Sequence, residues 1–323
     1  ATFPYLSQKD PLWGSKEYDS AGTWAGAEKS GIERWGCALT SAAMMLQNYD
    51  VQTATGSATT PDGLNDWLKN EPDGYIGLGH VNWLAITRYV RESYETEHAS
   101  TKLEFTRTYP PSTPELPAIL GVPGHFVVAH GEDATNWNIN DPASETKQTL
   151  DKTSTITSIN KFVPSLTDLS YMLLAIDSDT VATLTNESGA TVPGSWIDEY
   201  LSDDTELATG SAIRTLMIPK PSSGKYKLTV NRPADATERL VKIYLYDKLG
   251  NTDPLLLPLP LPTTYFEIQY GSEVGDIRSA VEVDRTPPSA PVLVSPAEGE
   301  HVNTNGLVLD WDEVEDPSTP ITY

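Results

Sequence analysis

Hydrophobic residues recur at helical spacing after the only cysteine of the chain, Cys37. The apolar residues at positions i, i+4, i+7, i+8 and i+11 are Ala38, Ala42, Met45, Leu46 and Tyr49. This spacing predicts one apolar stripe along a helix that begins near Cys37. We expect the stripe to be buried in a core, with Cys37 beside it at the first turn.

Two more helices are predicted in the same half of the chain. Thr60 and Pro61 are residue types that favour an N-cap and a first helical position, and they predict a short helix through Asn70. Another helix is expected to begin within 81–89, and one more strand within 150–162. Helices therefore dominate the expected structure as far as about residue 94.

A β-hairpin is predicted by two strand-like segments, 124–130 and 137–141, which are separated by turn-forming residues. If the hairpin folds about Asp133, His125 lies directly opposite Asp141 at its open end. The other opposed pairs are Val127 with Ile139 and Ala129 with Trp137. Because side chains alternate along a strand, we expect His125 and Asp141 on one face, within hydrogen-bond reach. The residues of opposite parity, expected on the other face, are His130, Asn138 and Asn140.

From about residue 166 the helical period disappears and short strands separated by turns follow. The predicted strands are 171–176, 214–218, 225–230, 240–246 and 265–270. Regular short strands of this kind predict an all-β sandwich domain over 166–284. The segment 196–200 is expected to form a short helix or turn. The proline-rich segment 255–262 is expected to be an edge strand or a polyproline-like connector.

The segment 285–323 begins with prolines that predict a stiff linker. Strand-like residues at 291–295 and 307–311 follow, and they resemble the opening strands of fibronectin type III or bacterial immunoglobulin-like modules. Because such a module needs roughly 100 residues, we expect a truncated β-sandwich start here and a longer full-length protein.

Cys37, His125 and Asp141 together predict a thiol-activating site. The free N–H groups and the positive dipole end at a helix start favour thiolate over thiol. Gly36 would let the backbone approach a substrate closely. A thiol nucleophile needs a base and a third group that orients the base, and these residue types supply both. The alternatives are a buried structural cysteine and a structural His–Asp pair.

The motifs that carry this chemistry resemble those of the bacteriocin-processing (double-glycine leader) peptidase-like family, a branch of the papain-fold cysteine peptidases. The matching stretches are 4–13, 36–44, 124–128 and 139–142. The resemblance implies an α+β papain-like cysteine peptidase domain over 1–165, ahead of the β-sandwich. It also implies these roles: Cys37 as nucleophile, His125 as base, Asp141 as orienting residue and Gln8 as oxyanion-hole donor. Gln8 departs from the leader-processing pattern, since a long segment separates it from Cys37.

The resemblance thus predicts a secreted or surface bacterial cysteine peptidase that hydrolyses peptide bonds in a peptide or protein substrate without a cofactor. One alternative is a cell-wall amidase or acyl transferase that uses the same triad. Another is an inactive papain-like domain in a surface adhesion or binding protein. In that case the tryptophans of the first domain would line a sugar or peptide cleft: Trp13, Trp24, Trp35, Trp67 and Trp83.

Composition narrows the expected partners and location. The formal charge is −23 and the pI about 4.4, which disfavours nucleic acid as a partner, because that binding depends on neutralising phosphates. No segment approaches the roughly 20 apolar residues of a membrane span. The five histidines have no paired spacing, so no metal site is predicted. We expect an extracellular or cell-surface protein, although this chain carries no signal peptide at its start.

Overall fold

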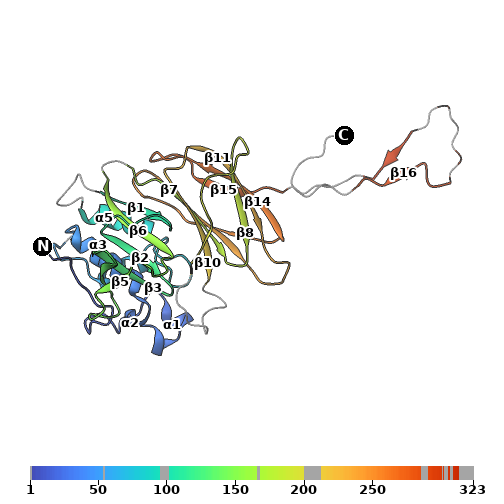
Figure 1. The fold of residues 1–323 in the computed structure, drawn as a ribbon. Coiled ribbons are helices and arrows are strands. Elements are labelled where there is room, and N and C mark those ends of the chain that lie inside the picture. The colour runs from blue at the N-terminus through green and yellow to red at the C-terminus, as the bar shows by residue number, and fades with distance from the viewer. Residues whose placement is uncertain are drawn as a thin grey trace.

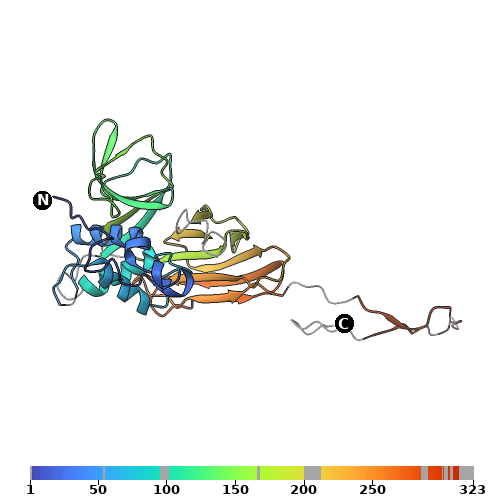
Figure 2. The same ribbon diagram turned by 90° about the horizontal axis from the view of Figure 1, so that it is seen from below.

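The computed structural model describes residues 2–53, 55–94, 102–165, 168–199, 212–284, 290–299, 301, 305 and 308–312. Most of the regular structure is β-sheet, and every strand pair is antiparallel. Helices occur only before the first strand among these residues. Figures 1 and 2 show the helices gathered at the N-terminal end, with the sheets following.

The helices of the N-terminal part surround one buried helix, α3. Their bounds are α1 Ala21–Trp24, η1 Ala27–Lys29, α2 Ile32–Trp35, α3 Cys37–Asn48, α4 Pro61–Asn70 and α5 Trp83–Tyr94. The helix predicted after Cys37 is present, but the single apolar stripe was too narrow an expectation. Every residue from Ala38 to Leu46 is buried, because α2, α4 and the sheet contact α3 from different sides. A helix covered all round buries more than one face.

The N-terminal cap predicted for α4 is confirmed. Thr60 has extended backbone geometry, and its hydroxyl accepts a hydrogen bond from the N–H of Gly63 at 3.3 Å. Pro61 occupies the first helical position, where its missing N–H costs nothing. Local capping residues therefore fix this boundary.

A six-stranded antiparallel sheet follows the helices. Its strand order is β1-β6-β2-β3-β4-β5, and α3 lies against β2 and β3. The bounds are β1 Lys102–Thr108, β2 Ala118–Val122, β3 His125–Glu132, β4 Asn136–Asn140, β5 Thr149–Asp151 and β6 Ser158–Ser165. The single strand predicted within 150–162 is wrong, since this region contributes to two strands, β5 and β6.

The β3–β4 hairpin forms as predicted, but its register differs from the symmetric one. Val128 pairs with Asn140 and Ala129 with Ile139, and the pairing shifts between Ala129 and Gly131. The expected opposition of Val127 to Ile139, of Ala129 to Trp137 and of His125 to Asp141 is therefore wrong. The turn is centred between Ala134 and Thr135, since Glu132 pairs with Trp137, and a one-residue bulge at His130 changes the offset again before the open end. The displacement near the open end is two residues, which leaves each side chain on its expected face.

Two further antiparallel sheets pack face to face across a shared apolar core. The five-stranded sheet has the order β13-β12-β7-β10-β9, and the four-stranded sheet has the order β15-β14-β11-β8. Their bounds are β7 Tyr171–Asp177, β8 Val181–Asn186, β9 Ile197–Glu199, β10 Ile213–Pro219, β11 Gly224–Asn231, β12 Leu240–Tyr246, β13 Leu255–Pro258, β14 Thr263–Tyr270 and β15 Ser279–Glu282. Leu174, Leu228 and Ile268 are among the buried residues that fill the space between the sheets. The regular strands expected in this half are present.

Two irregular segments of this half have different outcomes. The helix or turn expected at 196–200 is wrong, because Ile197–Glu199 pairs with β10 as the edge strand β9. The proline-rich segment was expected to be an edge strand or a polyproline-like connector. It contains the edge strand β13, whose one neighbour in the sheet is β12. Its prolines lack N–H donors, which is tolerated at a sheet edge.

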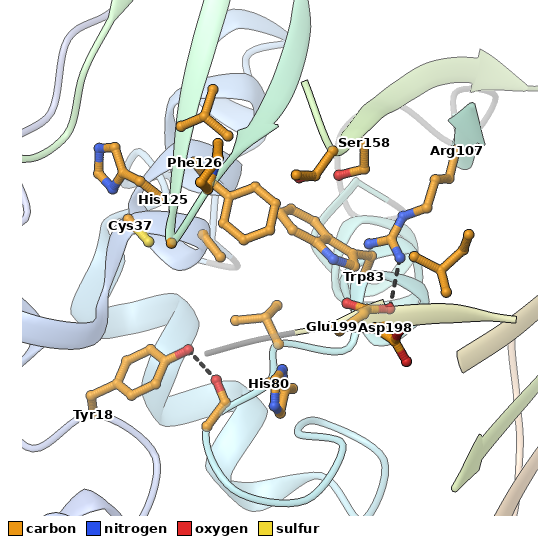
Figure 3. A pocket seen from close by; sticks show the side chains of 18 residues that line it. Tyr18, Cys37, His80, Trp83, Arg107, His125, Phe126, Ser158, Asp198 and Glu199 are labelled. Atoms are coloured by element: carbon orange, nitrogen blue, oxygen red, sulfur yellow. Dashed lines mark hydrogen bonds and ion pairs between the residues drawn. The ribbon is translucent and has the colours of Figure 1, made fainter. Parts of the chain in front are cut away.

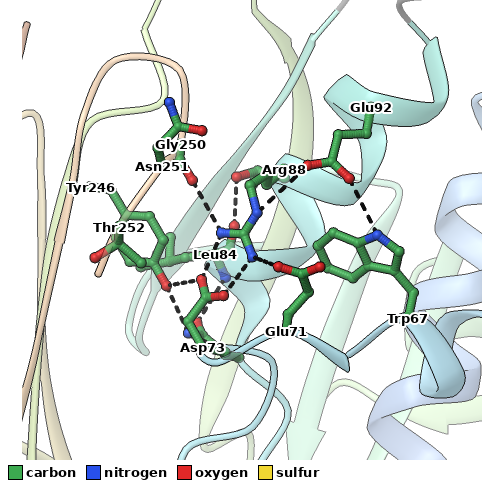
Figure 4. A network of polar contacts seen from close by, with 12 residues as sticks. Trp67, Glu71, Asp73, Leu84, Arg88, Glu92, Tyr246, Gly250, Asn251 and Thr252 are labelled. Carbon is green, nitrogen blue, oxygen red and sulfur yellow. Dashed lines mark hydrogen bonds and ion pairs between the residues drawn. The ribbon is translucent and has the colours of Figure 1, made fainter. Parts of the chain in front are cut away.

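The N-terminal part and the five-stranded sheet share one continuous core. Tyr171, Leu173, Tyr244 and Tyr246 of the sheet belong to the same buried cluster as the helices α3 and α5. A polar network lies within this contact (Figure 4): Arg88 donates to both carboxylate oxygens of Asp73, and the Tyr246 hydroxyl donates to Asp73 at 2.9 Å. The two parts are therefore joined by apolar packing and by fully buried polar contacts.

The last described elements are β16 Leu293–Ser295 and β17 Asp310–Trp311, which pair as a two-stranded ribbon with exposed side chains. Figures 1 and 2 both show β16 standing apart from the other sheets. Most of the predicted linker, 285–289, lies outside the described residues. None of the described helices is long and apolar enough to cross a membrane.

Candidate active site

Cys37 is the first residue of α3 and is partly exposed, whereas the residues that follow it are buried. Gly36 precedes it at the junction of α2 and α3. A Cβ atom on Gly36 would lie 2.6 Å from the backbone oxygen of Ile32, so a larger residue here would clash with the last turn of α2. The expectation that Gly36 lets the backbone approach a substrate stays a prediction, since this contact lies on the α2 side. The junction directs the thiol outward from the start of a buried helix.

His125 is placed by a tight turn between β2 and β3. Val122 pairs with His125, which leaves Pro123 and Gly124 as the two turn residues. Gly124 has φ 65°, a left-handed conformation that glycine adopts without strain, and proline suits the position before it. The turn makes His125 the first residue of β3, beside the start of α3, with 22% of its side chain exposed.

Asp141 follows directly after β4, and its side chain is almost fully buried. One of its oxygens, Oδ1, lies 2.7 Å from Nε2 of His125 and accepts a hydrogen bond from the N–H of Ala143 at 2.9 Å. The Lys147 ammonium lies 3.5 Å from the other oxygen. Burial alone would raise the pKa of Asp141, but the contacts with His125, Ala143 and Lys147 outweigh it and lower this pKa. Asp141 is therefore a carboxylate, and its predicted contact with His125 is present.

The second nitrogen of the His125 ring, Nδ1, is the one left for Cys37. Burial disfavours the charged ring, yet the hydrogen bonds to Asp141 and Cys37, together with their negative charges, raise the pKa of His125 to about 9. The imidazole is therefore held as a cation beside the sulfur near neutral pH. Figure 3 shows Cys37 and His125 at one end of a pocket. A cysteine sulfur and an imidazole in contact are the groups that a thiol hydrolase uses.

Gln8 lies close to these elements but is engaged in other contacts. Its backbone N–H donates to the oxygen of Pro142 at 2.8 Å, and its side-chain nitrogen donates to the oxygen of Glu33 at 2.7 Å. The side chain is buried, and among the described residues its Oε1 has no hydrogen-bond partner. Gln8 thus links the Asp141 loop to α2, just before Cys37, but it is not among the residues that line the pocket. One amide N–H remains after the bond to Glu33.

A cavity of about 350 Å³ opens beside Cys37 and His125 (Figure 3). Trp83 and Phe126 lie in the middle of the view, and Arg107, Asp198 and Glu199 lie at the end away from the thiol. Of the five tryptophans considered for a cleft, only Trp83 lines this cavity. Trp13 and Trp35 are buried, and their indole N–H groups donate to backbone oxygens.

Several cavity residues were not predicted from the sequence. Phe126 had a usable signal, since it adjoins His125 in the predicted strand. Arg107 and Glu199 had none, because they are 92 residues apart and meet only in the folded chain. Asn140, which was expected on the face opposite Asp141, donates to the oxygen of Pro4 and also contacts His130.

Within the described ranges, no group of three or more His, Cys, Asp or Glu side chains is arranged to hold a metal ion. Comparison of this chain with protein-family models, with curated proteins and with solved structures finds no match. The geometry of the site is therefore the basis for its function.

Proposed function

We propose that this protein is a cysteine peptidase that cleaves peptide bonds through Cys37, His125 and Asp141. The observation that carries the proposal is the position of one imidazole between a buried carboxylate and a helix-start thiol, at the mouth of a cavity. Three residue types with these contacts supply a nucleophile, a base and an orienting group. A structural role for a cysteine requires neither a cationic partner nor an adjacent cavity.

In the proposed reaction the Cys37 sulfur attacks the scissile carbonyl carbon and forms a C–S bond. His125 gives its proton to the leaving nitrogen as the C–N bond breaks, which leaves a thioester and a free amine. His125 then takes a proton from water as the water oxygen attacks the thioester, and the thiolate leaves as the carboxylic acid forms. Asp141 holds the ring in orientation throughout. The Cys37 backbone N–H, at the start of α3, stabilises the negative oxygen, with Gln8 as a second donor.

The proposed fold assignment follows the same reasoning. A helix that carries a thiol at its start and packs on an antiparallel sheet that carries a histidine and an aspartate is typical of papain-like peptidases. We assign residues 1–165 to such a domain and 166–284 to an immunoglobulin-like β-sandwich. A secreted or surface location is part of this proposal, as is a peptide or protein substrate.

Thiol labelling followed by peptide mapping tests the proposal. At about pH 6 an ordinary thiol is almost wholly protonated and reacts slowly. We expect iodoacetamide to label Cys37 of the native protein at this pH, and the His125→Ala variant to lose at least about tenfold in rate. Hydrolysis of a mixed peptide library, read by mass spectrometry as new termini, should disappear in the Cys37→Ala variant. A Cys37 that stays inert until denaturant is added would be a structural thiol, and the proposal would fail.

A further inference from the structure

One wall of the cavity beside Cys37 comes from the five-stranded sheet, which follows the N-terminal part in the sequence. All three residues of β9, Ile197, Asp198 and Glu199, line the cavity together with residues of α3, α5 and β3. Figure 3 shows Glu199 and Asp198 across the pocket from Cys37 and His125. The second part of the chain therefore contributes directly to the candidate site.

A buried ion pair fixes β9 in this position. Glu199 accepts from the Arg107 guanidinium of β1 at 2.7 Å and also from the Thr215 hydroxyl of β10. Arg107 also donates through Nε to Asn160 at 2.6 Å, and only 3% of its side chain is exposed. Burial opposes ionisation of Glu199, but the Arg107 charge outweighs it and lowers the pKa of this carboxyl group. The pair is thus charged on both sides, and its geometry is set by several contacts.

Ile197 lies on the same side of β9 as Glu199, because side chains alternate along a strand. Glu199 reaches across to β1, so Ile197 also faces the N-terminal part and the cavity. Asp198 pairs with Arg214 of the neighbouring strand at 2.7 Å. Ile197 is therefore the apolar residue through which β9 can contact a ligand.

The chemistry of the walls indicates what the cavity accepts. Trp83, Phe126, Val81 and Ile197 give the cavity an apolar surface. The far end carries Asp198 and Glu199, which are paired with Arg214 and Arg107, and His80 also lines the cavity. An acidic side chain would lose its hydration against the apolar surface, whereas an apolar side chain is favoured by its transfer from water to that surface. A volume of about 350 Å³ lies within the range of small ligand sites, roughly 300–1,000 Å³.

We propose that the cavity is a substrate side-chain pocket completed by β9, and that it selects a bulky apolar residue next to the scissile bond over an acidic one. This inference rests on the proposed peptidase function. In this proposal Ile197 is a specificity-determining residue. The C-terminal sheets contribute to substrate binding, whereas Cys37 and His125 carry out the reaction.

The test uses the full chain and three reagents that alkylate Cys37. Iodoacetamide has no side chain and reports thiol reactivity alone, while two peptidyl chloromethyl ketones differ only in carrying Phe or Asp next to the reactive carbon. We expect the Phe reagent to react at least about tenfold faster than the Asp reagent. Ile197→Trp, which fills the pocket, should slow the Phe reagent about tenfold and leave the iodoacetamide rate within about twofold.

Two further variants keep the result interpretable. Ile197→Ala, which adds no bulk, should also lower the ratio of the Phe-reagent rate to the Asp-reagent rate. The test can therefore still be made if the Ile197→Trp variant fails to fold. Val281→Trp adds similar bulk at an exposed position of β15 and should leave all three rates unchanged. Equal rates for the Phe and Asp reagents, or Ile197 variants identical to the parent, would overturn the specificity proposal alone. Loss of iodoacetamide labelling in the native parent would instead overturn the peptidase proposal.

Discussion

The Nε2 atom of His125 lies 2.7 Å from Oδ1 of Asp141, although the two residues are not paired in the β3–β4 hairpin. Asp141 lies just beyond the last paired residue of β4, Asn140, which is opposite Val128. The contact is therefore diagonal, across the open end of the hairpin, where an imidazole ring is long enough to span the distance. Asp141 is buried, and its Oδ1 also accepts a hydrogen bond from the Ala143 N–H. A carboxylate fixed by its own backbone can orient a base without moving.

Substitutions at Asp141 should show whether its side chain orients the His125 ring or only supports the folding of the hairpin. Asp141→Ala is expected to lower the rate of peptide hydrolysis by about 10²–10⁴-fold, because the ring loses its orienting acceptor. Asp141→Asn should be milder, since an amide oxygen still accepts the imidazole N–H. Steady-state hydrolysis of one peptide substrate measures both effects.

Asn140→Ala is the matched control for Asp141. It removes a neighbouring polar side chain whose contacts are with Pro4 and His130, on the opposite face. We expect its hydrolysis rate to stay within about twofold of the parent. If Asn140→Ala were as damaging as Asp141→Ala, the loss would reflect distortion of the hairpin, and the orienting role of Asp141 would be wrong.

The same pair should make stability depend on pH. The pKa of His125 is raised to about 9 in the folded chain, above its ordinary value near 6.5, so protonated His125 stabilises the fold fully below about pH 6.5. This contribution is lost as the pH rises through about 9. The pKa of Asp141 is lowered, so its contribution is present above about pH 4 and is lost on further acidification.

Asp141→Asn should therefore destabilise the protein most between about pH 4.5 and 6.5, by about 1.5–3 kcal/mol for a hydrogen bond between charged groups. The difference should shrink toward pH 10, where His125 is neutral in both proteins. Urea unfolding of parent and variant at three pH values measures this. A difference that grows with pH would mean that His125 is neutral in the native state.

Sequence patterns predicted the helices and strands that are determined by residues close together in the chain. Thr60 and Pro61 start α4 as its N-cap and its first helical residue. Polar and apolar residues alternate over 225–230, which gives β11 one solvent-exposed face and one buried face. The His125–Asp141 contact was predicted because parity along a strand does not change when the register slips by two residues. The register itself was not predicted, since the turn is centred between Ala134 and Thr135 and not on Asp133, and the bulge at His130 leaves no signal in an otherwise regular strand.

The rest depends on tertiary contacts that local patterns do not encode. Ile197–Glu199 is a strand only because β10 offers it an edge and Arg107 holds its carboxylate. A short segment flanked by charged and aromatic residues has no strand period of its own. The turn between β2 and β3 is different: Pro123-Gly124 is a clear turn signal, and with the apolar residues before it the strand β2 could have been predicted.

The Arg88–Asp73 pair should contribute strongly to stability where the N-terminal part meets β12. Asp73 is fully buried, and Arg88 donates to both of its oxygens, at 2.9 and 2.5 Å. Arg88→Ala leaves a buried carboxylate without its cation, which is expected to cost about 3–5 kcal/mol of unfolding free energy. Tyr246→Phe removes one hydrogen bond to the same carboxylate and should cost only about 1–2 kcal/mol. Urea titrations of both variants test this order, and an Arg88→Ala loss no larger than that of Tyr246→Phe would contradict it.

Gln8 can be assigned by comparing two reactions of the same thiol. Hydrolysis passes through a tetrahedral oxyanion, whereas alkylation by iodoacetamide displaces iodide and forms no oxyanion. If the remaining N–H of Gln8 stabilises that oxyanion, Gln8→Ala should lower hydrolysis by about 10²–10³-fold and leave the alkylation rate unchanged. If Gln8 only joins Glu33 to the Pro142 segment, its loss would displace Cys37 and His125 relative to each other. Both rates would then fall together, and the oxyanion role would be wrong.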